Sequence, residues 1–182
     1  MNPNPNPDPD PAKMPTGVRP QTPPEKQAWK ATNDDMEAIA EERREEGWDV
    51  VSMPTLHVNP ANREDDEEEL SGLAFILPNN HAEDFEDAYK GREFPEYLVY
   101  RREVKESAFL VLELIDPDSD TIILISGRYD LQHARGTIPS IIEQGEIAIY
   151  LQTIDGTRLA SATYDDYGAF VPTPDGDGDD SE

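Results

Sequence analysis

Three mostly apolar stretches lie in the middle of the chain, and short polar turns separate them. Their sequences are YLVYRREV, AFLVLELI and TIILIS. Runs of this length that are rich in β-branched and aromatic residues predict strands. The joint DPDSD between the last two, with Pro117, predicts a tight turn. The near-continuous apolar character of these strands indicates that both of their faces are at least partly covered.

Apolar residues recur at helical spacing in three other segments. The stretch TNDDMEAIAEERREEGW predicts a first helix that Asn33 caps at its N-terminus and Gly47 ends. The stretch NNHAEDFEDAYKGREF predicts a short second helix. A third helix is expected from the turn region after Ser126 to about Gln144, with a kink at Pro139 because proline removes a helical hydrogen bond.

The remaining strands complete the predicted fold. WDVVSMPTLHV reads as a strand with a break at Pro54, SGLAFILP as a second strand, and EIAIYLQTIDGTRLASATY as a hairpin that turns at Asp155 and Gly156. Helices mixed with meandering strands predict an α+β fold. We expect a single domain with a mainly antiparallel sheet of about six or seven strands packed with three helices.

The two ends of the chain differ from its interior in composition. Residues 1–28 are rich in proline, and residues 172–182 are acidic, with the sequence PTPDGDGDDSE after Val171. Both segments are predicted to be disordered tails, because they hold too little apolar surface to form a core. The α+β domain is therefore expected over residues 29–171, with the acidic stretch NPANREDDEEEL as a loop inside it.

The charge of the chain changes the picture of its surroundings. Lys and Arg number 15 against 40 Asp and Glu, which gives a net charge of −25. Such a surface repels itself in dilute buffer, whereas molar salt shortens the Debye length to about 3 Å. The apolar strands argue against disorder, so the composition indicates a halophilic globular protein. Nucleic acid is not an expected partner, because the sequence has no basic stripe.

The residue types also exclude some classes of chemistry. The chain has no Cys, which removes disulfides, thiolate catalysis and Cys-based zinc sites. Its three His residues are far apart in sequence, and we expect neither a metal nor another cofactor. No apolar run approaches the length that spans a membrane, so a soluble cytoplasmic protein is expected, without a membrane as partner.

The stretch SGRYDLQHARG is the first candidate site. Backbone N–H groups at a strand-to-helix junction can hold an anion, and Arg residues are scarce in this chain. The predicted anion pocket has five members, namely Ser126, Gly127, Arg128, His133 and Arg135. The alternative is an ordinary helix start in which Ser126 or Asp130 is the N-cap and Arg128 pairs with a surface carboxylate.

The stretch FPEYLVYRR is the second candidate, because it concentrates aromatic and basic residues. Tyr97, Tyr100 and Arg102 are the predicted contacts of a recognition edge for an acidic or peptide partner. On a strand, Tyr100 and Arg102 share a face. The alternative is that the Arg residues simply pair with neighbouring acidic helices.

Four blocks of the chain resemble a haloarchaeal family of small acidic cytoplasmic proteins of unknown function. These blocks are ATNDDMEAIAEERREEGWDVV, FPEYLVYR, YDLQHA and LQTIDGT, and the likeness runs from Trp29 to Phe170. The resemblance supports a salt-rich cytoplasm and implies no activity, ligand or catalytic residue. Pro139 departs from the pattern, since the corresponding helix in similar sequences lacks proline.

Taken together, these features favour a non-enzymatic module that binds a protein partner or a small ligand, with no catalytic residue assigned. Two alternatives stay open. One is an enzyme that acts on a small anionic substrate at the helix start after Ser126, and the other is a structural subunit of a larger assembly. A concave pocket around Arg128 and His133 would favour the enzyme, whereas an exposed aromatic edge near Tyr97 and Tyr100 would favour the binding module.

Overall fold

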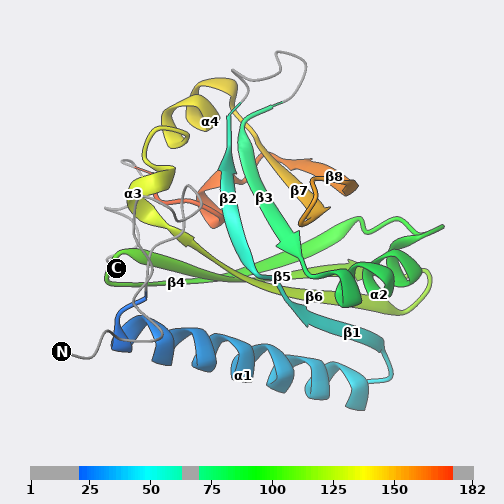
Figure 1. Cartoon of the computed structure of the whole chain (residues 1–182). Coiled ribbons are helices and arrows are strands. Elements are labelled where there is room, and N and C mark those ends of the chain that lie inside the picture. The colour runs from blue at the N-terminus through cyan, green and yellow to red at the C-terminus, as the bar shows by residue number, and fades with distance from the viewer. Residues whose placement is uncertain (1–20, 63–69, 174–182) are drawn as a thin grey trace.

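The computed structural model describes residues 21–62 and 70–173, in which eight strands form two four-stranded sheets (Figure 1). The first sheet has the order β1 (Asp49–Pro54), β6 (Thr121–Asp130), β5 (Ser107–Asp116) and β4 (Glu96–Val104). The second has the order β2 (His57–Ala61), β3 (Gly72–Leu77), β7 (Ile147–Thr153) and β8 (Arg158–Tyr164). The fold is therefore α+β, as the sequence predicts.

The expected single antiparallel sheet is wrong, because both sheets are mixed and the strands divide between them. β1 is parallel to β6 and β3 is parallel to β7, while the other neighbours are antiparallel. The division begins at the predicted break after Pro54. There the N–H and hydroxyl of Thr55 both bond to the carbonyl of Ser126, and the chain then leaves the first sheet for the second.

The main core lies between the two sheets, whose strands cross steeply in Figure 1. Alternate residues of β5 and β6 face it, and so do alternate residues of β3 and β7. Its fully buried members include Leu110, Leu112, Ile123, Ile125, Leu73, Phe75, Ile149 and Leu151. β5 and β6 are buried along nearly their whole length, which confirms that both of their faces are covered.

Helix α1 (Pro23–Glu45) begins ten residues before the expected cap at Asn33, and that expectation is wrong. The Thr22 hydroxyl accepts from the N–H of Glu25, whose side chain accepts from the N–H of Thr22. This capping box and the prolines of the first turn start the helix. Asn33 lies inside it and donates to the carbonyl of Trp29 at 3.0 Å. Residues 23–28, which the sequence placed in a tail, are therefore helical.

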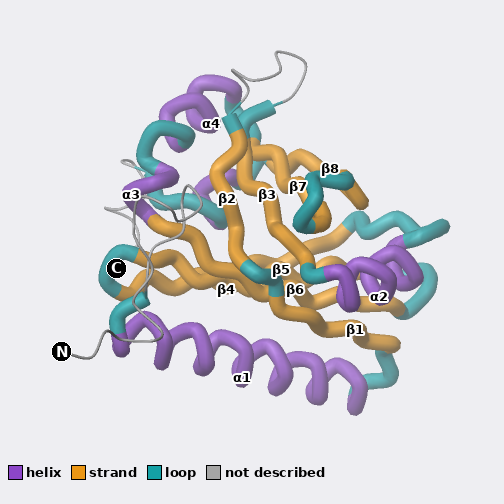
Figure 2. Tube along the Cα trace, in the orientation of Figure 1, coloured by secondary structure: helices purple, strands orange, loops and turns teal. Residues whose placement is uncertain are grey.

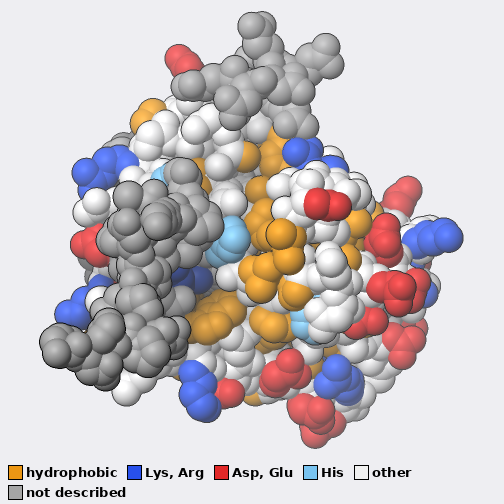
Figure 3. Space-filling view, viewed as in Figure 1, with side chains coloured by type: hydrophobic (Ala, Val, Ile, Leu, Met, Phe, Trp, Pro, Cys, Tyr) orange, Lys and Arg blue, Asp and Glu red, His pale blue; other side chains and the backbone are white. Residues whose placement is uncertain are grey.

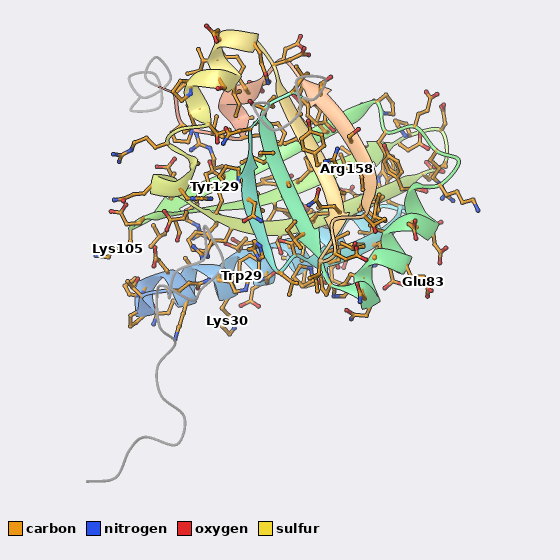
Figure 4. The ribbon with its side chains drawn as sticks, turned by 45° about the horizontal axis from the view of Figure 1, so that its top comes forward. Trp29, Lys30, Glu83, Lys105, Tyr129 and Arg158 are labelled. Atoms are coloured by element: carbon orange, nitrogen blue, oxygen red, sulfur yellow. The ribbon has the colours of Figure 1, made fainter. Side chains whose placement is uncertain are left out.

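Helix α1 covers the outer face of the first sheet, over β1, β6 and β5 (Figures 1 and 4). Met36 and Ala40 pack there in a second core, against Val111, Ile122 and Leu124. Trp29 lies on the sheet-facing side of the helix, with its ring centroid 6.5 Å from that of Phe109, whereas Lys30 points outward. The helix covers the outer face of β4 only in part.

The other helices lie at opposite ends of the sheets (Figure 2). Helix α2 (Asn79–Tyr89) confirms the second prediction. The expected single kinked helix after Ser126 is wrong, because β6 continues to Asp130 and two short helices follow, α3 (Leu131–Ala134) and α4 (Ile138–Gln144). Pro139 lies in the first turn of α4, where the missing N–H removes no helical bond.

Two turn predictions are confirmed, and several predictions fall on undescribed residues. The DPDSD joint connects β5 to β6, and the stretch around Asp155 and Gly156 connects β7 to β8. A short 3₁₀ turn, η3 (Tyr167–Ala169), follows β8.

Residues 1–20 and 174–182, and 63–69 of the acidic loop, lie outside the described residues. On the face shown in Figure 3, carboxylates gather over one side.

Candidate functional site

Strand β4 is an edge of the first sheet, because it pairs only with β5. The two strands are in unbroken register from Glu96, opposite Ile115, to Val104, opposite Ser107. Only two residues separate Val104 from Ser107, at the hairpin tip where Figure 4 shows Lys105. Consequently one side of β4 exposes an unpaired strand edge within the described part of the chain.

The outer face of β4 carries large apolar side chains that remain in contact with solvent. Leu98 is 45% exposed and Tyr100 is 39% exposed. Arg102 follows at the next position of the same face, since side chains alternate along a strand. These three residues are called the β4 face below. Solvent-exposed leucine and tyrosine on an edge strand are typical of a protein-binding surface.

A groove with a volume of about 430 Å³ runs between α1 and the β4 face. Buried side chains form its floor, helical side chains form one wall, and polar groups stand at its rim. The lining residues are Thr32, Asp35, Ala38, Ile39, Tyr100, Arg101, Arg102, Phe109 and Val111. Its volume lies within the range of ligand pockets, about 300–1,000 Å³.

Tyr100 is held in place by two charged residues beneath α1. Its hydroxyl donates to Oε1 of Glu113 at 3.0 Å, and Arg43 donates to both carboxylate oxygens of Glu113. Burial of the ring, and then the bond to Glu113, raises the pKa of Tyr100 above its usual range. The phenol therefore stays neutral near pH 7 and acts as a fixed aromatic wall, not as an acid–base group.

Arg102 is paired less firmly than Arg43. Its NH2 donates to Oδ2 of Asp35 on α1 at 3.3 Å, and both side chains are largely exposed. An exposed pair of this kind contributes only about 0–1 kcal/mol. A carboxylate of a partner can therefore replace Asp35 at little cost. The Arg102–Asp35 contact is also what the alternative interpretation of this stretch expects, in which the Arg side chains pair with an acidic helix.

The structure separates Tyr97 from the other two predicted contact residues. Tyr97 points to the opposite face of β4, where its ring centroid lies 4.2 Å from that of Tyr164 and 6.2 Å from that of Phe170. Burial raises its pKa. Tyr100 and Arg102 do share a face. Leu98 belongs with them and was missed, although the two-residue alternation of β4 would have identified it.

Three residues of the predicted anion pocket lie within β6, not at a strand end. The Ser126 hydroxyl donates to Oδ1 of Asn33 at 2.6 Å, which ties the strand to α1. Arg128 is only 6% exposed and donates to the Ser107 hydroxyl at 2.9 Å. Gly127 lies where β2 crosses β6, and a Cβ there would come 2.4 Å from Cγ2 of Val58. Each of the three residues therefore has a structural contact.

The other two predicted pocket residues lie beyond the end of the strand. Asp130 caps α3 by accepting from the N–H groups of Gln132 and His133, as the ordinary helix-start interpretation expects. Arg135 is exposed and lines a separate hollow of about 620 Å³ beside α4 and Pro172. Arg128 and His133 are not among the residues lining that hollow.

Within residues 21–62 and 70–173, no three His, Asp or Glu side chains gather closely enough to hold a metal ion. None of the helices in the same ranges combines the length and the hydrophobicity needed to cross a membrane.

Comparison with known proteins identifies a family. Residues 18–172 match a family of unknown function, DUF7529, and this match covers most of the chain. No curated protein matches the chain, and no solved structure does.

Proposed function

Because the chain belongs to DUF7529, a family of unknown function, we propose a function from its geometry: it is a non-enzymatic module that binds an extended segment of a partner protein along β4. The observation that carries this proposal is the exposure of Leu98 and Tyr100 on an edge strand, beside a groove with an apolar floor. In this mode the strand edge supplies backbone hydrogen bonds, and the groove receives alternate side chains of the partner.

The composition of the surface also favours a protein partner. Tyrosine and arginine dominate the energetic centres of protein interfaces, and the β4 face presents Tyr100 and Arg102 next to Leu98. The bound segment is expected to place an apolar side chain on Tyr100 and a carboxylate near Arg102. The neutral, hydrogen-bonded phenol of Tyr100 is suited to packing.

An enzyme acting on a small anion after Ser126 has less support. The polar groups of that stretch have structural contacts, since Asp130 caps α3 and Arg128 bonds to Ser107. A role as a structural subunit is compatible with the same β4 surface. We place the module in a salt-rich cytoplasm of haloarchaeal type, which the net charge of −25 and the sequence resemblance support.

The proposal can be tested with a displayed library of random peptides. The library is selected in molar KCl on the full-length chain, which is immobilised at low density, because high salt suppresses unspecific attraction of basic peptides to the acidic surface. Enriched peptides should bind the wild type and lose about tenfold or more in affinity with Leu98→Asp, which removes a buried apolar contact.

Ile154→Asp is the matched control for this test. Ile154 is 62% exposed near the β7–β8 turn, away from β4, so its replacement should leave peptide binding unchanged. Circular dichroism establishes that both variants are folded. The proposal is overturned if no peptides are enriched, or if Leu98→Asp and Ile154→Asp have equal effects on the enriched peptides.

A further inference from the structure

The free edge of β4 has a defined set of hydrogen-bonding groups. A two-residue connection makes Val104 and Ser107 a hydrogen-bonded pair, and such pairs alternate along an antiparallel ladder. The backbone groups of Val104, Arg102, Tyr100 and Leu98 therefore point toward β5. Those of the intervening residues Tyr97, Val99 and Arg101 point away from the sheet, toward the free edge.

This edge lacks a bulge or a proline that would block pairing with another strand, although η3 contacts β4 where Arg101 donates to the carbonyl of Gly168. Natural edge strands carry a proline, a bulge or a run of like charge. β4 has unbroken register, and its nearest proline is Pro95, just before the strand begins. Its charged residues are of both signs, with Glu96 at one end and Arg101, Arg102 and Glu103 toward the other, where Arg101 pairs with Glu103. Such an arrangement suits a strand that pairs with a reversed copy of itself.

We propose that the partner of β4 is a second copy of this chain, whose β4 pairs antiparallel with the first around a two-fold axis at Val99. This inference rests on the proposed function and names its partner. On the outer face, Glu96 then lies opposite Arg102 of the second copy, and Leu98 lies opposite Tyr100 of the second copy. Each contact occurs twice by symmetry.

The inner face and the backbone match in the same register. Tyr97, which packs on Tyr164 within its own chain, lies opposite Arg101 of the second copy, and Val99 lies opposite Val99 of the second copy. The outward backbone groups of residues 97, 99 and 101 then form about six hydrogen bonds across the axis. The register therefore matches Glu96 with Arg102, Leu98 with Tyr100 and the outward backbone groups of both strands.

Neighbouring registers are less complementary. An axis at Arg101 places two Arg101 guanidinium groups opposite each other, and like charges in that position are destabilising. An axis at Tyr100 places Leu98 opposite Arg102 and Tyr97 opposite Glu103. Of these three axes, only the one at Val99 places Glu96 opposite Arg102.

The position of α1 fits this dimer. The helix lies mainly over β1, β6 and β5 and covers β4 only in part, where Asp35 contacts Arg102, so that the free edge of β4 stays open to a second copy. A two-fold axis perpendicular to the joined sheet places both α1 helices on the same side. The two grooves then face each other across the axis, and Leu98 and Tyr100 of both copies pack together on the floor between them.

The net charge of the chain allows pairing with a second copy to be distinguished from binding of a basic partner by its salt dependence. Two copies with a net charge of −25 each repel one another, and added salt screens this repulsion. Self-pairing should therefore strengthen as KCl rises. Binding of a basic segment to the same edge would weaken over the same range.

Analytical ultracentrifugation of the full-length chain tests the association. The wild type should form dimers in molar KCl and dissociate as the salt is diluted. Val99→Pro, which removes the N–H at the axis and leaves the bonds to β5 in place, should weaken the dimer about tenfold or more. Lys30→Glu, a change on the outward side of α1, should have no such effect.

A charge exchange tests the register itself. Glu96→Arg alone and Arg102→Glu alone each place like charges opposite one another and should weaken the dimer about three- to tenfold. The double variant restores opposite charges and should recover most of the loss. A merely unfolded or surface-perturbed variant would not be rescued in this way.

A single cysteine gives an independent readout, because the chain has none of its own. In a hydrogen-bonded pair at the axis, two Cα atoms lie about 5.5 Å apart, a distance that suits a disulfide. Val99→Cys should therefore cross-link the chain into dimers on mild oxidation, whereas Ile154→Cys should not.

The outcomes separate this inference from the proposed function. A wild-type chain that stays monomeric at all salt concentrations, while library peptides still require Leu98, overturns self-pairing and leaves the binding module standing. Dimers that ignore Val99→Pro and the charge exchange also overturn it, since they assemble elsewhere. Absence of both dimers and Leu98-dependent peptides would overturn the inference together with the function on which it rests.

Discussion

Arg43 on α1 binds the carboxylate of Glu113 on β5 with two hydrogen bonds, although 70 residues separate them in the chain. The Nε–Oε2 distance is 2.7 Å and the NH2–Oε1 distance is 3.3 Å. Glu113 is fully buried and also accepts a hydrogen bond from the hydroxyl of Tyr100. The pair therefore fastens the helix to the sheet and orients an aromatic residue of the candidate site at the same time.

Replacing Arg43 by alanine should destabilise the fold. The carboxylate of Glu113 would lose its countercharge inside the protein, which costs about 3 kcal/mol in the free energy of unfolding. Urea unfolding at constant salt measures this. Arg44→Ala is the control, because Arg44 is exposed and pairs with exposed Glu41, so that the change should stay within about 0.5 kcal/mol. Equal effects of the two substitutions would show that the buried pair has no special weight.

The close approach of β2 to β6 at Gly127 leads to a second prediction. Gly127→Ala places a methyl group 2.4 Å from Cγ2 of Val58 and 3.2 Å from Oγ1 of Thr55, so strands of both sheets must move. We expect a loss of about 1–3 kcal/mol in the free energy of unfolding. Gly136→Ala, which meets nothing within 4 Å, should be neutral or slightly stabilising. A tolerated Gly127→Ala would contradict the packing role assigned to this residue.

The elements were predictable where a local pattern dictates them. The apolar runs of β5 and β6 identify strands, and the stretches around Pro117 and Gly156 identify the β5–β6 and β7–β8 turns. The assignment of strands to two sheets was not predictable, because a strand covered on both faces looks the same in either sheet. The start of α1 was not predictable from proline content, because proline is common both in disordered tails and in the first turn of a helix, where Pro23 lies after Thr22.

The candidate site was also predictable only in part. Alternation along β4 places Tyr100 and Arg102 on one face, and the same alternation places Tyr97 on the other. That separation was available from the sequence alone. The burial of Arg128 was not, because it depends on the packing of α1 and on the Ser107 hydroxyl, which lies 21 residues away in the chain. Charged residues near a predicted turn therefore do not indicate a pocket by themselves.

The half-buried His57 on β2 predicts how stability depends on pH. Burial, and then the positive charge of Arg128, lowers the pKa of His57 below its usual value of about 6.5. As pH falls, the unfolded chain binds the proton first, so the unfolded state gains stability relative to the folded one. The contribution of neutral His57 is complete above about pH 6.5 and is lost as the pH falls from there through the folded-state pKa.

His57→Gln isolates this contribution, because glutamine does not titrate. The free energy of unfolding of the wild type should fall more steeply between pH 7.5 and pH 5 than that of the variant, at constant ionic strength. His81→Gln is the control, because His81 lies on α2, apart from Arg128. Parallel pH profiles for the wild type and His57→Gln would contradict the lowered pKa.

Salt should control the stability of the whole fold as well as its association. The described ion pairs hold few of the carboxylates of this chain, and most of those pairs are partly exposed. In dilute buffer the remaining negative charges repel one another and oppose the compact state. Raising KCl to molar concentration shortens the Debye length to about 3 Å and removes most of this repulsion. Far-UV circular dichroism should therefore show ordered structure in molar KCl and a loss of it on dialysis to low salt.

Comparing different salts and sucrose distinguishes screening of the carboxylates from a general strengthening of apolar burial. If screening of carboxylates is the cause, KCl and a less strongly excluded salt such as KNO₃ should stabilise the fold similarly at equal ionic strength. Sucrose strengthens apolar burial without ions, so it should not replace the salts. A reduced net charge gives a second check. Changing exposed carboxylates of α1 to their amides, for example Glu42→Gln with Glu45→Gln, should lower the salt concentration at which the fold is half formed. A chain that is equally folded in nearly salt-free buffer would show that its two apolar cores outweigh the repulsion without help from ions.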